Sequence, residues 1–268
     1  MLDILGNEWN IKPAGGQTGE AYIARSGGRK LFLKRNSSPF LAVLSVEGIV
    51  PKLLWTKRLE NGDVITAQRW LNGRELHENE MKSGAVVDLL KKIHRSDALL
   101  AMLKRLGKQP VTPQAVLAEL ESRMRIGNMI GGQAAGEAYS FLADNVDKVE
   151  SGEKVVCHCD VNHNNWLLSE NGDLYLIDWD NAMIADPALD LGPLLYEYVA
   201  KSEWRSWLGR YGHELTGDFL LRMHWYATAQ AAKFMIWHAG RKESRQAEKL
   251  RIRLVRLNRD AAFYLQQL

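Results

Sequence analysis

The first 70 residues alternate between apolar and polar positions, the pattern of β-strands that bury one face. The segment 19–36, GEAYIARSGGRKLFLKRN, alternates on both sides of Gly27-Gly28 and predicts a β-hairpin. The segment 51–70, PKLLWTKRLENGDVITAQRW, predicts a second hairpin that turns at Asn61-Gly62-Asp63. The apolar run 39–47, PFLAVLSVE, predicts a short helix between them. We therefore expect a small antiparallel sheet of five strands with one helix.

Beyond about residue 79 the apolar positions recur at helical spacing, as in the segment 81–97, MKSGAVVDLLKKIHRSD. Residues 112–150 predict two more helices, interrupted near GNMIGG. Residues 154–180 return to short strands, and residues 187–268 are again helical. The fold class is therefore α+β, with strands first and helices afterwards.

The change of period near LNGREL, residues 71–76, predicts two lobes: a sheet lobe at 1–73 and a mainly helical lobe at 74–268. A chain of 268 residues is long enough to bury a core in this way. The net charge of +3 is too small to indicate binding to nucleic acid or to a membrane surface. No apolar run approaches the roughly 18 residues of a membrane span. The N-terminus lacks the basic start of a signal peptide, so we expect a cytoplasmic protein.

Polar and acidic side chains gather in one otherwise apolar stretch, residues 155–192. Asp178 ends the strand-like run YLID, and Asp160 stands five residues before Asn165. An unpaired buried acid costs free energy, and a magnesium ion removes that cost because it takes hard oxygen ligands together with substrate phosphates. A second acid beside a substrate hydroxyl can orient it and accept its proton. This division of labour between acids is that of phosphoryl transfer.

The two cysteines, Cys157 and Cys159, are spaced C-x-C in the same stretch. A zinc site would need two more soft ligands nearby, and the sequence offers none at zinc spacing. We expect two reduced, buried thiols.

The motif His-x-Asp-x₄-Asn in HCDVNHNN is followed after thirteen residues by Asp178 in YLIDWDNA, and then by DPALDLG. Two such features at one spacing are far more specific than either alone. Together they resemble the signature of the aminoglycoside phosphotransferase and choline kinase family, which are small-molecule kinases of protein-kinase-like fold. The resemblance covers nearly the whole chain. It implies an ATP-dependent kinase with Mg²⁺ as cofactor and an alcohol group as phosphoryl acceptor.

The resemblance also implies roles for the polar residues of the motif. Asp160 corresponds to the catalytic base, and His158 braces the catalytic loop. Asn165 and Asp178 correspond to the metal ligands. Asp180 adds either a metal contact or a hydrogen bond behind the ligands.

The glycine-rich segment PAGGQTGEAYIA corresponds to the loop that covers the ATP phosphates, because backbone N–H groups of such a loop can bind anions. Glycine clusters are also common in plain hairpin turns. The residues expected at the phosphates are Gly15, Gly16, Gln17, Thr18 and Gly19.

Lys34, on the third expected strand, corresponds to the lysine that reaches the α- and β-phosphates, although a lone strand lysine is usually a surface residue. The family usually pairs this lysine with a helix glutamate, but Glu47 lies too far along the chain to serve. Either another acid pairs with Lys34, or Lys34 binds phosphate without one. Arg69, Trp70 and Leu71 in TAQRWLNG correspond to the hinge at adenine, with Trp70 as a wall.

The catalytic loop departs from the common HGDLHPGN at Asn162, His163 and Asn164. These side chains can bond to substrate hydroxyls, and His163 is equally well a plain loop histidine. We expect Asn162, His163 and Trp166 to contact the acceptor, with Trp166 as an apolar wall. The helical segment 223–240, MHWYATAQAAKFMIWHAG, adds further candidates, although most of its aromatic side chains are expected in the core.

No acidic cluster in residues 112–150 or 220–268 is dense enough to attract a polycation, which argues against aminoglycosides. Within the family, GGQTGEAY and HCDVNHNNWLL resemble the YtmP-like, CcrZ-type phosphotransferases of Gram-positive bacteria, which are linked to cell-cycle control. This resemblance implies ribose or 2-deoxyribose as the acceptor.

Three alternatives remain open: a choline-type kinase, an aminoglycoside-type kinase, and a nucleotide-binding pseudokinase-like scaffold for cell-division or replication proteins. The intact Asp160, Asn165 and Asp178 argue against the scaffold, whereas the missing partner of Lys34 argues mildly for it.

Overall fold

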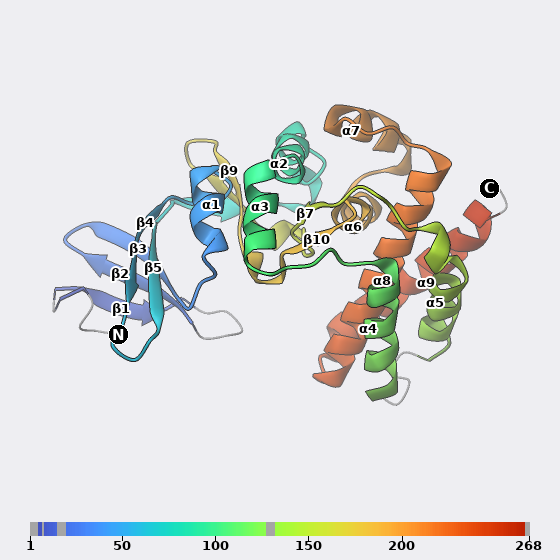
Figure 1. Ribbon diagram of the computed structural model, residues 1–268, viewed down its shortest axis with the longest axis horizontal. Helices are drawn as coiled ribbons and strands as arrows, with labels where there is room; N and C mark the ends of the chain where they lie inside the picture. The colour runs from blue at the N-terminus through green and yellow to red at the C-terminus, as the bar shows by residue number, and fades with distance from the viewer. Residues whose placement is uncertain (1–4, 7, 15–19, 127–131, 266–268) are drawn as a thin grey trace. The chain divides into compact units, whose positions relative to one another are not determined.

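The computed structural model describes residues 5–6, 8–14, 20–126 and 132–265, with side chains to residue 261 (Figure 1). The chain forms two compact units. We call the first the sheet unit; it comprises Met1–His77, Asp97–Met102 and His163–Asp180. The second, the helical unit, comprises Glu78–Ser96, Leu103–Asn162 and Asn181–Leu268.

The division of the chain at residue 77 lies close to the predicted lobe boundary. Two later segments nevertheless belong to the sheet unit. The prediction of one boundary along the chain did not include them. One of them, His163–Asp180, carries the expected metal ligands, so the proposed site residues are distributed over both units.

The sheet unit contains the predicted five-stranded antiparallel sheet, in the order β1-β2-β3-β5-β4. Both predicted hairpins are confirmed, with Gly27 and Gly28 at positive φ in the first turn. Ala24, Leu33 and Ile65 are buried on one face of the sheet, as the alternation of the sequence requires. The strands are β1 (Asn10–Pro13), β2 (Ala21–Ser26), β3 (Arg29–Arg35), β4 (Leu53–Arg58) and β5 (Val64–Arg69).

A second, three-stranded sheet in the same unit has the order β6-β8-β9 and joins distant parts of the chain. Gly73 in β6 crosses β8 so closely that a Cβ atom would lie 2.3 Å from the Leu168 carbonyl oxygen, so only glycine fits there. The elements are α1 (Phe40–Val46), β6 (Gly73–Glu75), β8 (Trp166–Ser169) and β9 (Leu174–Leu176).

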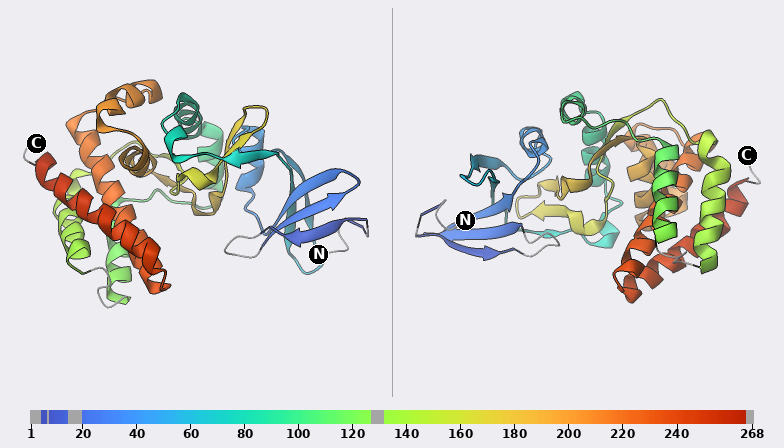
Figure 2. Two further views of the ribbon diagram at one scale, coloured as in Figure 1. Left: turned by 180° about the vertical axis from the view of Figure 1, so that it is seen from behind. Right: turned by 60° about the horizontal axis from the view of Figure 1, so that its bottom comes forward.

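In the helical unit, α8 (Gly217–Gly240) is the central helix and packs against α4, α5, α6 and α9 (Figures 1 and 2). Its sequence is apolar on nearly all sides, which is typical of a helix surrounded by others. Thr216 caps its first turn by accepting a hydrogen bond from the Phe219 N–H at 3.2 Å. Among the described helices, none has an apolar stretch long enough to cross a membrane.

The helices predicted at 81–97, 112–150 and 187–268 are confirmed. The sequence pattern missed the helix α3 and the short strands β6 and β10, and strands of three residues show too little periodicity to be recognised. The remaining helices are α2 (Gly84–His94), α3 (Asp97–Arg105), α4 (Pro113–Ile126), α5 (Gly132–Asn145), α6 (Ala188–Tyr198), α7 (Trp204–Tyr211) and α9 (Ser244–Leu265). The strands β7 (Val155–Cys157) and β10 (Met183–Ala185) pair with each other, and 3₁₀ turns occupy η2 (Glu78–Glu80), η3 (Val146–Lys148), η4 (His163–Asn165), η5 (Trp179–Asn181) and η6 (Lys201–Glu203).

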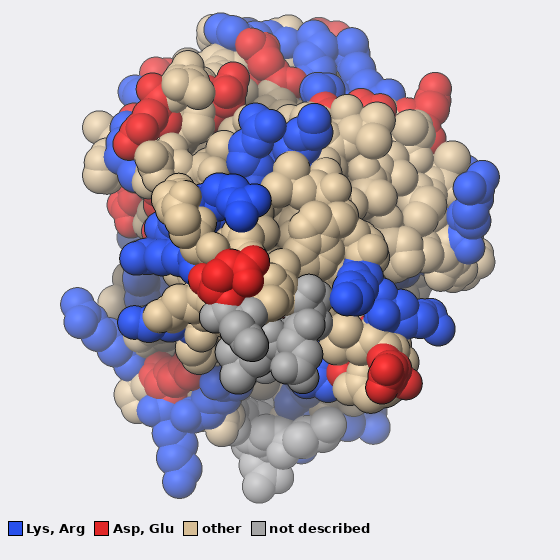
Figure 3. Space-filling view, turned by 90° about the vertical axis from the view of Figure 1, so that its left-hand side faces the viewer, with Lys and Arg blue, Asp and Glu red and all other residues tan. Residues whose placement is uncertain are grey.

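The surface shown in Figure 3 carries more lysine and arginine than aspartate and glutamate side chains, in keeping with the net charge of +3.

His224 lies in the core of the helical unit, where its Nδ1 is 2.8 Å from the Tyr196 hydroxyl and its ring meets that of Phe141 edge to face. Burial lowers the pKa of His224 from 6.5 to about 4. The unfolded chain therefore binds a proton that the folded chain excludes between pH 6.5 and 4. The stability due to the neutral ring is complete above pH 6.5 and is lost as the pH falls toward 4.

We predict that His224→Leu reduces the loss of unfolding free energy between pH 6.5 and 4 by up to about 3 kcal/mol relative to wild type, measured by urea denaturation. Tyr196→Phe is the matched control, because it removes the same hydrogen bond but keeps the imidazole; it should retain the wild-type pH dependence. Equal pH dependence in His224→Leu and wild type would contradict the assignment.

Candidate functional site

The β8–β9 hairpin brings Asn165 and Asp178 together at its open end. Trp166, at the start of β8, pairs with Leu176, at the end of β9, and the Ile177 N–H donates to the Asn165 carbonyl at 2.8 Å. Asn165 thus lies opposite Ile177, and Asp178 is the next residue, so both polar residues lie at the open end of the hairpin. The thirteen-residue spacing of the sequence motif spans the hairpin from Trp166 to Leu176 and the residues at its open end.

Asp178 and Asp180 lie in the turn that leaves this hairpin, and both side chains face solvent, 61% and 54% exposed. Asp178 has φ +67°, a backbone conformation that is uncommon for residues other than glycine and that often occurs at functional turns. With the amide oxygen of Asn165, these carboxylates form a set of hard oxygen donors on adjoining segments. This set suits Mg²⁺, which prefers carboxylates and keeps several positions for water and phosphate.

Lys34 on β3 has an acidic partner within the sheet unit. Its Nζ donates to Asp180 Oδ1 at 2.9 Å and Oδ2 at 2.8 Å, and lies 3.9 Å from Asp178 Oδ1. The open question of the Lys34 partner is thereby answered: an acid other than a helix glutamate serves. The ion pair links the strand lysine directly to the two expected metal-binding acids.

The expected hinge residues follow the end of β5. The Arg69 N–H donates to the Lys52 carbonyl at 2.8 Å, which ends the pairing of the two strands. Trp70 is half-buried; its Nε1–H donates to Asn72 Oδ1 at 3.2 Å, and the Lys30 ammonium lies 3.4 Å from the ring centroid. Leu71 is also half-buried. The expected phosphate loop, Gly15, Gly16, Gln17, Thr18 and Gly19, lies outside the described residues.

In the helical unit, Asp160 is partly exposed and is held by its own loop. The Asn162 amide donates to Asp160 Oδ1 at 2.6 Å, and the Asp160 N–H donates to His158 Nδ1 at 3.3 Å. Because Nδ1 of His158 accepts this bond, its proton lies on Nε2 in the neutral ring. His158 is fully buried, and its ring holds the Asp160 backbone in place through this hydrogen bond. This contact fits the bracing role expected of His158.

A buried carboxylate in α6 fixes the start of this loop. Asp190 Oδ2 accepts the His158 N–H and Oδ1 accepts the Cys159 N–H, both at 2.7 Å. Cys159, which immediately precedes Asp160, has φ +70°. Asp190 therefore stabilises a backbone conformation that few residues adopt by themselves and thereby sets the position of Asp160.

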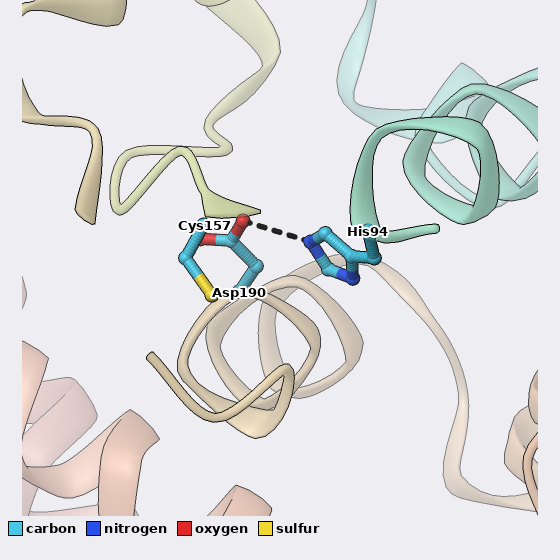
Figure 4. Close-up of side chains that lie close together, drawn as sticks. All are labelled: His94, Cys157 and Asp190. Atoms are coloured by element: carbon cyan, nitrogen blue, oxygen red, sulfur yellow. Dashed lines mark hydrogen bonds and ion pairs between the residues drawn. The ribbon is translucent and has the colours of Figure 1, made fainter. Parts of the chain in front are cut away.

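His94 of α2 completes the environment of Asp190, as Figure 4 shows. His94 Nε2 lies 3.2 Å from Asp190 Oδ2, and its Nδ1 lies 2.7 Å from the Tyr211 hydroxyl of α7. Cys157 lies in the same cluster and donates its S–H to the Asp186 carbonyl at 3.3 Å.

His94, Cys157 and Asp190 offer three potential metal ligands within 4.8 Å of one another. Each of them is already engaged in hydrogen bonds, and burial, followed by the Asp190 charge, raises the pKa of the Cys157 thiol well above its ordinary value. The hydrogen bonds of these three residues connect the loop to α2 and α6, so this cluster supports the loop structurally.

The structure corrects one expectation about the acceptor. The Trp166 side chain has no exposed surface in β8, so its ring has no face to offer a substrate. Asn162 and His163 are partly exposed, and they fall in the helical unit and the sheet unit, respectively.

The chain matches the model of the phosphotransferase enzyme family over residues 11–223. It belongs to this family. The enzyme is therefore a phosphotransferase that acts on a hydroxyl acceptor. The matched range includes Lys34, Asp160, Asn165, Asp178 and Asp190.

Solved structures of the same fold cover almost the whole chain. Choline kinase LicA from Streptococcus pneumoniae is 18% identical, with a TM-score of 0.69 over 97% of this chain and 96% of that one. A putative aminoglycoside phosphotransferase from Ralstonia eutropha is 13% identical, with a TM-score of 0.70 over 99% and 94% of the two chains. A thermostable mutant of aminoglycoside phosphotransferase APH(4)-Ia is 16% identical, with a TM-score of 0.66 over 97% and 98%. They confirm the predicted kinase-like α+β fold.

Reasoning from the sequence missed two residues that support the phosphotransferase loop, His94 and Tyr211, and gave no role to Asp190. Asp190 lies in the motif DPALDLG, whose second acid sits inside an apolar helix; a buried helical acid is itself a signal, because it must have hydrogen-bond partners. His94 and Tyr211 have no such signal, since each ends an ordinary amphipathic helix.

We predict that Asp190→Asn lowers the free energy of unfolding by about 3 kcal/mol, because one backbone N–H of the loop would face an amide NH₂ instead of an oxygen. Urea denaturation measures this change. Asp88→Asn is the control: its ion pair with Arg210 at 2.7 Å is exposed, and such pairs contribute little. If both variants were equally stable, Asp190 would not anchor the loop.

Proposed function

We propose that this phosphotransferase transfers the γ-phosphoryl group of ATP to a hydroxyl of a small sugar, with ribose or 2-deoxyribose as the acceptor and Mg²⁺ as the cofactor. The observation that carries the proposal is the loop 158–165. One end of it holds Asp160 in a fixed backbone conformation, and its other end leads into β8 at Asn165, whose carbonyl accepts the N–H of Ile177, the residue before Asp178. Only four residues separate the proposed base from the first proposed metal ligand.

On the nucleotide side, Asn165 and Asp178 would hold Mg²⁺, with Asp180 beside them. A Mg²⁺ ion held there would supply positive charge that neutralises the phosphates. Lys34 carries three N–H donors and makes its described bonds to Asp180, so it is held where an ammonium can also meet phosphate oxygens. Among the similar structures, LicA is known in complex with AMP, and APH(4)-Ia with AMP-PNP and hygromycin B, which supports a nucleotide donor.

On the acceptor side, Asp160 would accept the proton of the attacking hydroxyl as that oxygen bonds to the γ-phosphorus and the bond from this phosphorus to the oxygen of the leaving ADP breaks. The 2.6 Å bond from the Asn162 amide to Oδ1 holds the Asp160 carboxylate in place within the loop. Because a phosphoryl transfer depends mainly on position and electrostatics, the constraint on Asp160 matters as much as its basicity.

The acceptor assignment is supported by the polar side chains next to Asp160 and by the resemblance to YtmP-like, CcrZ-type enzymes. That resemblance also motivates a link to cell-cycle control. A choline acceptor is the second candidate, because LicA covers nearly the whole chain. The scaffold alternative loses its main support, since Lys34 has an acidic partner.

The acceptor assignment is tested by steady-state ADP release with ribose, 2-deoxyribose, choline and kanamycin at equal concentrations. We expect the highest kcat/KM with one of the two pentoses. Asp160→Asn should bind ATP normally and lose about 10²- to 10⁴-fold in kcat, as expected of a positioned general base. A clear preference for an amine would overturn the sugar assignment, and an active Asp160→Asn would remove the residue from its role.

The metal assignment is tested by calorimetric titration of ATP with and without magnesium. Asp178→Asn should weaken magnesium-dependent ATP binding by about 10-fold or more, because the amide removes the ligand charge while asparagine tolerates the positive φ. Asp173→Asn, at the exposed turn of the same hairpin, is the matched control and should bind like wild type. If both variants keep the wild-type magnesium dependence, Asp178 is not a ligand.

A further inference from the structure

One face of α8 is partly exposed although the rest of that helix is buried. Gln230, Lys233, Phe234 and Trp237 are half-buried, whereas residues 225–229 are buried throughout. These four positions are spaced i, i+3, i+4 and i+7, so they lie along one side of the helix.

The face begins at the proposed catalytic base. The Gln230 amide donates to the carbonyl of Cys159, the residue before Asp160, at 3.0 Å. Lys233 follows Gln230 by three residues, roughly 4.5 Å along the helix axis. Burial and the Asp190 carboxylate raise the pKa of the Cys159 thiol well above its usual range, and the Lys233 ammonium acts in the opposite sense. Gln230 thus connects this side of α8 to the residue before Asp160, and Lys233 lies about one turn farther along the same side.

Lys233 is tied to the neighbouring helix α4 through Glu119. Its Nζ lies 3.0 Å from Glu119 Oε1 and 3.1 Å from Oε2, and Arg123 donates to Oε1 from Nε at 3.0 Å and from Nη2 at 2.8 Å. Burial alone would raise the pKa of Glu119, but the bonds from Lys233 and Arg123 outweigh it and hold the pKa below its usual value. Glu119 is therefore ionised, and the three side chains carry a net charge of +1.

This charge arrangement determines which acceptors can bind. A choline or aminoglycoside acceptor needs carboxylates or open aromatic faces to meet its positive charge. Glu119 already binds two cations, and the Arg241 guanidinium lies over the Trp237 ring at 4.6 Å from its centroid. A neutral polyol meets no such obstacle, because its hydroxyls can accept from Lys233 and Gln230 and donate to Glu119.

Building on the proposed kinase function, we propose that Gln230, Lys233 and Glu119 bind the acceptor next to Asp160 and make the enzyme selective for neutral polyhydroxylated acceptors over cationic ones. Lys233 and Glu119 are then specificity residues, and Gln230 connects acceptor binding to the catalytic loop. The side chains of Lys233 and Glu119 are 32% and 41% exposed, and the half-buried Gln230 bonds directly to the loop, so a ligand can reach them without unfolding the helix pair.

The experiment compares kcat/KM for 2-deoxyribose and for choline in wild type, Lys233→Met, Lys233→Arg and Glu119→Gln. Lys233→Met should lower the ratio of the two kcat/KM values by about 10-fold or more, mainly through a higher KM for the sugar, because hydrogen bonds to hydroxyls dominate such discrimination. Lys233→Arg should restore most of the ratio, since it keeps the charge. Glu119→Gln should also raise the sugar KM.

Glu121→Gln is the matched control. It makes the same chemical change two residues farther along α4, where Glu121 pairs with the exposed Arg125, and it should leave the ratio unchanged. Glu119 keeps Arg123 as a partner when Lys233 is replaced, so the variants should fold, which thermal unfolding confirms.

The outcomes separate this inference from the proposed function. If wild type uses a sugar but Lys233→Met and Glu119→Gln behave like Glu121→Gln, the inference is wrong and the kinase proposal stands. If wild type prefers choline, the proposed selectivity for neutral over cationic acceptors is wrong. If wild type phosphorylates none of the acceptors, the proposed function fails and the inference fails with it.

Discussion

The structure of the catalytic loop depends on one buried carboxylate. Asp190 has no exposed surface, and an ionised acid in such a position is tolerated only when hydrogen bonds replace its water. The replacement comes from the loop itself, through the N–H groups of His158 and Cys159, and from His94. The requirement is mutual, because those two N–H groups follow the end of β7 and Asp190 supplies an acceptor to each of them. The loop and α6 therefore stabilise each other. The bonds from His158 and Cys159 to Asp190 also fix the position of Asp160, the next residue.

A second constraint, the β8–β9 hairpin, holds Asn165 and Asp178 at the same open end, and the β3 lysine bonds to the next acid, Asp180. None of these contacts requires burial of a charge, since the side chains of both aspartates are more than half exposed. The acids remain available for ligands, whereas Asp190 does not. Burial therefore distinguishes the roles of these carboxylates. The buried Asp190 stabilises the loop, whereas the exposed Asp178 and Asp180 can bind ligands.

Much of this could be predicted from the sequence because it depends on local pattern. The two hairpins follow from alternation and turn residues, and the spacing of Asn165 and Asp178 in the motif is long enough for the β8–β9 hairpin to lie between them. The partner of Lys34 could not be predicted, because Asp180 lies 146 residues away along the chain. The expectation that Trp166 contacts the acceptor was wrong for a related reason. An aromatic residue beside a loop can face either side of its strand, and tertiary packing determines which side it faces. The bonds of Gln230 and Lys233 depend on helix packing, which periodicity does not specify.

The central claim is that a fixed Asp160 and the acids of the hairpin direct a phosphoryl group from ATP to a sugar hydroxyl. The most direct test is ³¹P nuclear magnetic resonance of wild type incubated with magnesium, ATP and 2-deoxyribose. The account predicts that the γ-phosphate signal of ATP is replaced by a phosphomonoester signal that couples to protons of the sugar. Release of inorganic phosphate alone, with no phosphomonoester formed, would contradict it.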